Sequence, residues 1–316
     1  MISNQEKSPR LSIGMPVYNG ELFIQRAIES ILAQTFTDFE LIISDNNSTD
    51  STQEICEKFL KQDNRIRYFR QDKNIRTHRN FIFLLKQAKG KYFAWTAVDD
   101  YLDNDYMEKN INVLVSNKNV VSSVGKIVPF GADSLDINSE VIQTTKYPKF
   151  IKDHVKNSRR QKLMDTAPVS GSYEEKIRSL LKNTKSLSRF YGVNRTEQLQ
   201  KCIVETPFIN VEVAIFLNLL KFGDFHEETS TILHKFEQGI SGTGMFNMIQ
   251  NSMHNWFGTL FPFYPYTSWF IKNLGLKNFL KNIDIFFQPK YSRWICLNDR
   301  CNYVNKKEIL LLIIQK

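Results

Sequence analysis

Two adjacent aspartates, Asp99 and Asp100, end an apolar and aromatic run in the stretch KYFAWTAVDDYLDNDY, residues 91–106. Neighbouring carboxylates repel each other, so the pair costs free energy unless water, a cation or a donor-rich ligand stabilises it. Taken alone, the pair is most simply interpreted as a solvated turn. The alternative is a site for a divalent cation, which one or two carboxylates can hold together with phosphate oxygens.

The segments around this pair alternate between strand-like and helix-like patterns. β-Branched and apolar runs predict strands, and apolar residues near a 3.6-residue spacing predict helices. The predicted strands are 10–18, 39–45, 66–71, 91–98 and 120–130, and the predicted helices are 21–34, a helix through Ile55, Phe59 and Leu60, 78–90 with Gly90 as its C-cap, and 103–117. This alternation predicts βαβ units and an α/β fold, a mostly parallel sheet flanked by helices.

Polar clusters follow three of these strands. They are PVYNG at 16–20, DNNSTD at 45–50 and DDYLD at 99–103. Ligands of such sheets bind beyond the carboxyl ends of the strands, so the three clusters are expected at one edge. That position favours a ligand site over a solvated turn for the aspartate pair.

The pattern is less regular after residue 130. Residues 131–172 lack periodicity and contain the basic stretch KDHVKNSRRQK, which indicates a long loop or lid. Further on, the sequence predicts a helix at 173–183, a strand running into a turn at 188–195, an apolar helix at 209–223 and a short strand at 230–236.

Composition limits the class of protein. Of 316 residues, 42% are hydrophobic and 24% charged, which is typical of a soluble globular protein. The net charge of +9 favours an anionic partner. The four cysteines (Cys56, Cys202, Cys296 and Cys301) lack the spacing of a disulfide framework or zinc site and predict reduced thiols. With a polar N-terminus and no apolar run of about 18 residues, we expect a cytoplasmic protein.

Transfer of a group from a nucleoside diphosphate carrier needs acidic side chains of this kind. Asp99 and Asp100 suit a metal and a ribose, and Asp45 suits the base or ribose. The alternative to a base or ribose contact is that Asp45 forms an Asx-turn or caps a helix, an interpretation that fits Asp50 better.

Basic residues just before the fourth strand suit the phosphates. Arg76 and Arg79 are candidates, with plain solvation of a helix start as the alternative. His78 lies between them and is expected to be a structural hydrogen bonder.

At this point the sequence resembles a known family. The stretch LSIGMPVYNGELFIQRAIESILAQTFTDFELIISDNNSTDST is similar to the opening of family 2 glycosyltransferases, which have the GT-A fold. The similarity continues in DKNIRTHRNFIFLLKQAKGKYFAWTAVDDYLDNDYMEKNINVL and is strong over residues 10–125. It is weaker in SRFYGVNRTEQL and INVEVAIFLNLLKFGDFHEETSTIL. The resemblance implies a Rossmann-like, GT-A-type sheet and an inverting, metal-dependent transfer of sugar from a nucleoside diphosphate.

The resemblance also assigns residues. By position, the nucleotide-sugar pocket is implied to contain Pro16, Tyr18, Asn19, Asp45, Arg76, Arg79 and Asp99, and the DXD-like motif that holds Mn²⁺ or Mg²⁺ is implied to be Asp99 and Asp100. Relatives often carry an earlier Asp in this motif, whereas here Thr96–Val98 precede the pair. Which of the two carboxylates contacts the ion therefore stays open, and Asp100 is the preferred candidate. Many relatives have glycine where this chain has Arg76.

The general base of relatives is usually an Asp before a helix in the second half, and Glu212 occupies the matching position. The alternative role for Glu212 is structural: a Glu in the first turn of a helix complements the helix dipole. The resemblance implies donors carried on UDP, GDP or dTDP and a hydroxyl acceptor on a glycan or lipid-linked molecule, in cell-surface polysaccharide or lipopolysaccharide synthesis. A catalytically inactive glycan- or nucleotide-binding module of the same fold is the alternative function. A nucleotidyltransferase is disfavoured, because PVYNGE is not its Gly-rich, Arg-containing loop.

We expect two domains: a glycosyltransferase domain at 1–240, with a nucleotide-sugar half at 1–130 and an acceptor half at 131–240, and a mainly helical extension at 241–316. From Asn251 onward the extension has nine Lys or Arg and three Asp or Glu among many aromatic residues. It is interpreted either as peripheral contact with the inner face of the membrane or as a packed helical subdomain. No nucleic-acid recognition motif accompanies it.

Overall fold

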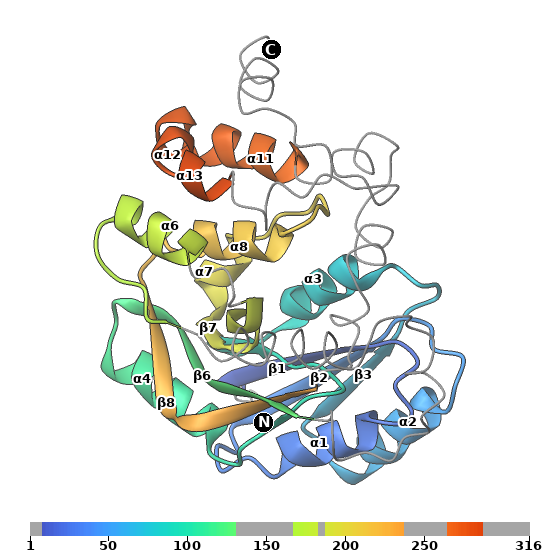
Figure 1. Ribbon diagram of the computed structural model, residues 1–316. Coiled ribbons are helices and arrows are strands. Elements are labelled where there is room, and N and C mark those ends of the chain that lie inside the picture. The colour runs from blue at the N-terminus through green and yellow to red at the C-terminus, as the bar shows by residue number, and fades with distance from the viewer. Residues whose placement is uncertain (1–7, 131–166, 183–186, 237–263, 287–316) are drawn as a thin grey trace, which may run out of the picture. The chain divides into compact units, whose positions relative to one another are not determined.

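The computed structural model describes residues 8–130, 167–182, 187–236 and 264–286 (Figure 1). Its strands are β1 Leu11–Val17, β2 Phe39–Asp45, β3 Ile66–Arg70, β4 Tyr92–Trp95, β5 Tyr101–Leu102, β6 Val120–Phe130, β7 Val193–Arg195 and β8 Asp224–Phe236. Its helices are α1 Ile24–Leu32, α2 Thr52–Gln62, α3 Thr77–Gln87, α4 Tyr106–Ser116, α6 Tyr173–Lys182, the 3₁₀ helix η1 Leu187–Tyr191, α7 Thr196–Gln200, α8 Val211–Leu219, α11 Tyr264–Leu274, α12 Leu276–Lys281 and α13 Ile283–Phe286.

The described strands form one sheet in the order β3-β2-β1-β4-β7-β6-β8-β5. Strands β1 to β4 pair in parallel, with β1 between β2 and β4 and β3 outside β2. β7 runs antiparallel to both β4 and β6, β6 and β8 pair in parallel, and β5 is antiparallel to β8. The sheet is therefore mixed but mostly parallel, which confirms the predicted α/β class.

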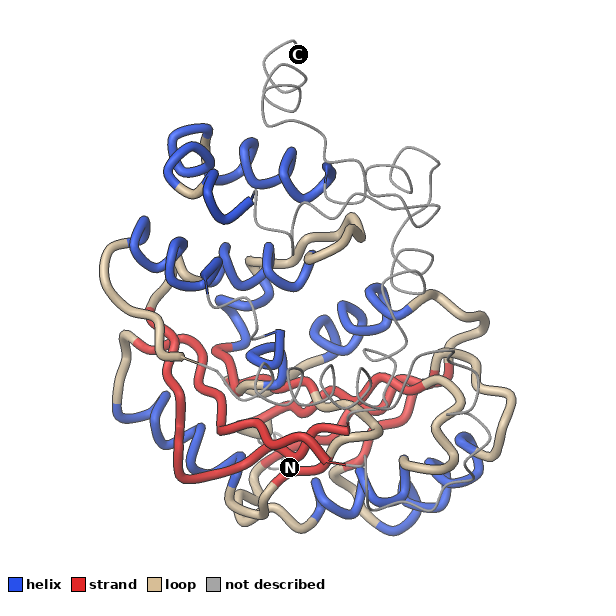
Figure 2. Tube along the Cα trace, viewed as in Figure 1, coloured by secondary structure: helices blue, strands red, loops and turns tan. Residues whose placement is uncertain are grey.

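Helices cover both faces of this sheet. Figures 1 and 2 show α1, α2 and α4 on one face and α3 on the other. Ile13 and Met15 of β1 are fully buried with Ile24 and Ile28 of α1 in one core cluster. Because both faces are covered, the central strands are apolar almost throughout and do not alternate between apolar and polar residues.

Three local predictions were wrong. Residues 188–195 were expected to be a strand running into a turn, whereas η1 precedes a strand of only three residues, β7. No strand was predicted within the DDYLD cluster, yet Tyr101 and Leu102 form β5 by pairing with β8. The strand expected at 230–236 begins earlier, at Asp224, because it pairs along β6 past a register irregularity.

Gly90 does not cap α3, which ends at Gln87 with Ala88 in an extended conformation. A Cβ atom added to Gly90 would lie 2.6 Å from the Ser12 nitrogen and 2.7 Å from the Leu11 carbonyl carbon. This glycine is therefore required by the close approach of two backbones at the start of β1 and β4.

The chain divides into two compact units, one of residues 1–205 and 215–244 and the other of residues 206–214 and 245–316. The domain boundary expected after residue 240 lies outside the described residues, as do residues 131–166 of the predicted lid. In the second unit, Tyr266 and Phe270 of α11 and Phe286 of α13 pack their rings against one another. The described part of the C-terminal extension, 264–286, is thus helical, as predicted.

None of the helices within the described ranges combines the length and apolar character needed to cross a bilayer.

We expect Gly90→Ala to lower the free energy of unfolding by about 1–3 kcal/mol, because the added methyl group meets backbone atoms that cannot rotate away. Urea denaturation followed by circular dichroism measures the change. Lys91→Ala, at the exposed neighbouring position, is the control and should stay within about 0.5 kcal/mol of wild type. A Gly90→Ala protein as stable as wild type would show that the two backbones are farther apart than described.

Candidate functional site

The loops after β1, β2 and β4 meet at one edge of the sheet. The Asn19 N–H donates to Ser48 Oγ at 2.9 Å, and Asn19 Oδ1 accepts the Thr49 N–H at 2.9 Å. A Cβ atom on Gly20 would lie 3.0 Å from a methyl carbon of Val98, so the first loop also contacts the loop after β4. The three predicted polar clusters are therefore brought together.

Asp45 lies at the end of β2 and is fully buried. Its Oδ1 accepts the Ser48 N–H at 2.8 Å, and its Oδ2 accepts the Tyr68 hydroxyl at 2.7 Å and the Arg70 guanidinium at 2.9 Å. These donors compensate the buried charge and fix the turn that follows β2. The assignment of Asp45 to the base of a nucleotide stays a prediction.

Asn46, the residue after Asp45, was not singled out in the sequence. Its Oδ1 accepts the Ile75 N–H at 2.7 Å, and its Nδ2 donates to Asn74 Oδ1 at 3.0 Å. The Arg76 N–H donates to that same Asn74 oxygen at 2.9 Å. Asn46 thus connects the end of β2 to the loop before α3. The sequence signal that could have identified Asn46 is its amide side chain directly after the candidate Asp45.

The predicted phosphate-binding arginines lie at the start of α3. The side chains of Arg76 and Arg79 are exposed, and Arg76 has φ 72° and ψ 158°, a backbone conformation that favours glycine. His78 Nε2 lies 2.8 Å from the Val204 carbonyl oxygen. The structure therefore gives His78 the hydrogen-bonding role expected from the sequence.

Two further candidates lie at the end of β1. Pro16 is half-buried opposite Ser44 of β2, and Tyr18 is exposed just after the strand. Both belong to the edge at which the loops meet.

Asp100 is a second buried carboxylate of this edge. Only 3% of the residue is exposed, and its Oδ1 accepts the Phe236 N–H of β8 at 2.8 Å. Its Oδ2 is buried and has no hydrogen-bond partner among the described residues. Burial raises the pKa of Asp100 well above its usual range, and the charge of Asp99 adds to this against the opposing charge of Lys235.

Asp99 is half-buried, and burial raises the pKa of its carboxyl as well. The positive charges of Lys235 and Arg26 act in the opposite direction. Because an unpaired buried carboxylate is costly, the pair is suited to receive a positive charge from outside the protein.

This geometry fits a divalent cation. The partnerless Asp100 Oδ2 would supply an oxygen ligand, and Asp99 lies next to Asp100 in the chain. Among the described residues, no group of three or more His, Cys, Asp or Glu side chains could hold a metal ion. A cation at this edge would accordingly complete its shell with water and phosphate oxygens, as Mg²⁺ commonly does.

Glu212 lies in the first turn of α8 and belongs to the second compact unit. Its side chain is half-buried, and burial raises the pKa of its carboxyl. A raised pKa suits a carboxylate that must accept a proton near neutral pH. Its role as a base stays a prediction.

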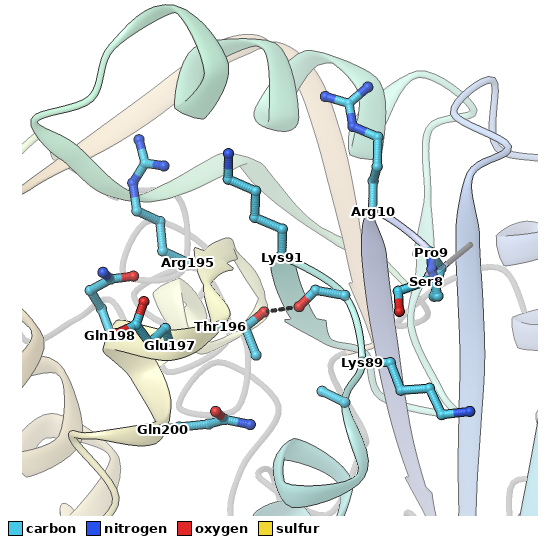
Figure 3. Close-up of a pocket in the computed structure, with 12 residues that line it drawn as sticks. Ser8, Pro9, Arg10, Lys89, Lys91, Arg195, Thr196, Glu197, Gln198 and Gln200 are labelled. Atoms are coloured by element: carbon cyan, nitrogen blue, oxygen red, sulfur yellow. Dashed lines mark hydrogen bonds between the residues drawn. The ribbon is translucent and has the colours of Figure 1, made fainter. Parts of the chain in front are cut away.

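A separate cavity of about 570 Å³ lies at the amino ends of β1 and β4, opposite the loops described above. Lys91 and Arg195 extend side by side at this cavity (Figure 3). Arg195 donates to the carbonyl oxygens of Leu114 and Val120, so it fixes the end of α4. The position at the amino ends of the strands separates this cavity from the candidate site.

Comparisons with known proteins agree with the family resemblance and the fold. The sequence model of the family described as Glycosyl transferase family 2 matches residues 12–177, more than half of the chain. A Campylobacter jejuni protein named GalNAc(5)-diNAcBac-PP-undecaprenol beta-1,3-glucosyltransferase is 30% identical over 201 residues, which are 60% of this chain and 58% of that protein. An uncharacterized glycosyltransferase of Haemophilus influenzae is 34% identical over 114 residues, covering 36% of this chain and 46% of the relative. The chain thus spans less than two thirds of either relative.

Solved structures share the fold. The crystal structure of residues 1–349 of TarS from S. aureus has a TM-score of 0.58 and 17% identity, over 91% of this chain and 76% of that one. The mannosyltransferase PcManGT of Pyrobaculum calidifontis, in complex with GDP-Man and Mn²⁺, has a TM-score of 0.51 and 10% identity, over 98% of this chain and 80% of that one.

We expect Asp100→Asn to stabilise the metal-free protein at pH 8 and not at pH 4. A carboxyl whose pKa is raised on folding binds more protons in the native than in the unfolded state, so it lowers stability as pH rises above its ordinary pKa. The asparagine removes this cost and keeps an oxygen for the Phe236 N–H. Thermal unfolding in chelator should show a Tm gain of at least about 2 °C at pH 8. Equal destabilisation at both pH values would contradict the assignment.

Proposed function

The chain belongs to glycosyltransferase family 2, and on this basis we propose that it is an inverting glycosyltransferase. It moves a sugar from a nucleoside diphosphate to a hydroxyl group of an acceptor. The observation that carries the proposal is the buried Asp100 carboxylate with a partnerless oxygen, next to Asp99 at the edge where the strand ends meet.

The donor side of the site consists of the loops after β1, β2 and β4 and the start of α3. Pro16, Tyr18, Asn19, Asp45, Arg76, Arg79 and Asp99 are the proposed contacts to nucleotide and sugar. The solved relatives support a nucleoside diphosphate donor, since TarS has been crystallised with UDP and with UDP-GlcNAc, and PcManGT with GDP-Man and Mn²⁺. UDP, GDP and dTDP sugars are the donors to test.

Asp100 and Asp99 would hold the divalent cation, Mn²⁺ or Mg²⁺. When bound, such an ion neutralises the negative charge that develops on the leaving diphosphate. Arg76 and Arg79, with exposed guanidinium groups at the start of α3, supply further positive charge to the phosphates.

The proposed transfer is a single displacement. The Glu212 carboxylate accepts the proton of the acceptor hydroxyl, and the hydroxyl oxygen attacks the anomeric carbon on the face opposite the diphosphate. The bond between that carbon and the diphosphate oxygen breaks, and its electron pair leaves with the diphosphate. Attack from the opposite face inverts the configuration at the anomeric carbon.

The acceptor is proposed to be a glycan or a lipid-linked glycan in cell-surface polysaccharide or lipopolysaccharide synthesis. The name of the Campylobacter jejuni relative, a glucosyltransferase named for an undecaprenol-linked glycan, supports this class. Transfer to a lipid-linked acceptor agrees with a cytoplasmic protein that contacts the inner face of the membrane through its basic, aromatic C-terminal part.

A catalytically inactive glycan- or nucleotide-binding module of the same fold is the rival function. The state of Asp100 favours an enzyme, because a buried carboxylate without a partner lowers stability and has no evident use in a module that binds no cation.

Nucleotide release from a panel of UDP-, GDP- and dTDP-sugars distinguishes the two functions. We expect one donor to be turned over with Mn²⁺, with activity lost in chelator and restored by added Mn²⁺. Asp100→Asn should lower turnover at least about a hundredfold, since it removes charge stabilisation of the leaving group. Donor binding without turnover for any sugar, with acceptor glycans present, would favour the inactive module.

Glu212→Gln tests the base. The amide keeps the shape of the side chain but cannot accept the proton, so turnover should fall at least about a hundredfold while donor affinity stays within about twofold. Glu197→Gln, an exposed glutamate in an ion pair with Lys201, is the matched control and should behave as wild type. Wild-type turnover by Glu212→Gln would assign the base to another residue.

A further inference from the structure

Arg26 reaches from α1 to the acidic pair. Its Nη2 donates to the Asp99 carbonyl oxygen at 3.1 Å. Its guanidinium carbon lies 5.3 Å from the ring centre of Tyr101 and 5.1 Å from that of Phe130. One side chain of α1 therefore contacts the backbone of the aspartate pair and two aromatic rings beside it.

The two rings are themselves held in place. Tyr101 and Phe130 pack edge to face at 4.9 Å, and Tyr101 stacks on His234 at 4.3 Å. His234 in turn lies 2.8 Å from an Asp103 carboxylate oxygen. Because the rings come from β5 and β6 and the imidazole from β8, the surroundings of the Arg26 guanidinium are fixed by three strands.

These surroundings suit arginine and not lysine. The planar guanidinium can lie against aromatic rings and donate a directed hydrogen bond at the same time, whereas an ammonium group is a compact, strongly hydrated charge. The Arg26 Nε is buried without a hydrogen-bond acceptor among the described residues. A desolvated donor of this kind is expected where the group is held for its geometry.

The attachment of β5 to α1 does not depend on Arg26. The Leu102 N–H donates to Ser30 Oγ at 3.1 Å, and Gln34 Nε2 donates to the Asp103 carbonyl oxygen at 2.8 Å. β5 is also paired with β8. Loss of Arg26 should consequently affect the backbone at Asp99 and leave the surrounding fold in place.

We propose that Arg26 is a positioning residue for the acidic pair: by holding the Asp99 carbonyl between α1 and the Tyr101–Phe130 rings, it fixes the Asp100 carboxylate for the divalent cation. The Phe236 N–H holds one carboxylate oxygen from β8, and Arg26 holds the preceding peptide from α1. Asp100 Oδ2 is then fixed from two sides before the cation arrives. This inference rests on the proposed metal-dependent function and adds a residue outside the acidic motif.

The test uses the full chain with Arg26→Gln and Arg26→Lys and Mn²⁺ as the probe, with bound ion measured by electron paramagnetic resonance. We expect both variants to bind Mn²⁺ about tenfold more weakly, the loss that corresponds to one hydrogen bond to a charged group. Amide hydrogen exchange should increase at residues 96–100 and not elsewhere. Raising Mn²⁺ should restore turnover, because the carboxylates are still present.

Arg10→Gln is the matched control. The Arg10 guanidinium carbon lies 5.5 Å from the Phe36 ring centre. Arg10→Gln therefore removes a comparable contact just before the amino end of β1. Its Mn²⁺ affinity and exchange at 96–100 should equal those of wild type. Should Arg26→Gln fail to fold, Arg26→Lys, which keeps the charge and the side-chain stem, supplies the measurement.

The outcomes separate the two proposals. Wild-type Mn²⁺ affinity in a folded Arg26→Lys or Arg26→Gln protein would overturn the positioning role and leave the glycosyltransferase proposal intact. A lower Tm, with weaker binding that high Mn²⁺ does not restore, would make Arg26 a structural residue only. If wild type itself bound no Mn²⁺, alone or with UDP or GDP, the metal-dependent function would fail and the role of Arg26 with it.

Discussion

The candidate site depends on one costly group, the buried carboxylate of Asp100. One of its oxygens accepts the Phe236 N–H of β8, and the other is buried without a partner in the described part of the chain. A side chain that is costly to bury keeps its position only if the surrounding fold constrains it, and burial favours its protonated form. The pairing of β5 with β8, the aromatic rings beside it and the Arg26 contact supply that constraint. Under the proposed function, binding of a divalent cation would recover the resulting free-energy cost.

The parallel part of the sheet explains why the pair lies where it does. β1, β2 and β4 run in the same direction, so their carboxyl ends and the three polar loops share one edge. β8, which pairs in parallel with β6, has a different role. β8 approaches from far along the chain to supply the backbone donor for Asp100, and it also pairs with the short strand that follows the acidic pair.

Much of this could be predicted from local sequence patterns. The strand and helix periodicities predicted the mostly parallel sheet, and the polar residues at strand ends predicted the edge. The contacts that fix Asp100 could not be predicted, because Phe236 is 136 positions away and contributes only its backbone. Arg26 resembles any solvent-facing cation on an amphipathic helix, and the two residues of β5 are too few for a period. Gly90 was misinterpreted as a helix cap because a close approach between β1 and the segment before β4 is not a local property.

Anomalous X-ray scattering from crystals soaked with Mn²⁺ and a nucleoside diphosphate would measure directly whether Asp100 holds a divalent cation. We expect an anomalous peak at coordination distance, about 2.1 Å, from Asp100 Oδ2, with a phosphate oxygen on the same ion. A peak away from Asp99 and Asp100, or Asp100 Oδ2 hydrogen-bonded to a protein donor with nucleotide bound and no ion beside it, would show that Asp100 does not hold the cation.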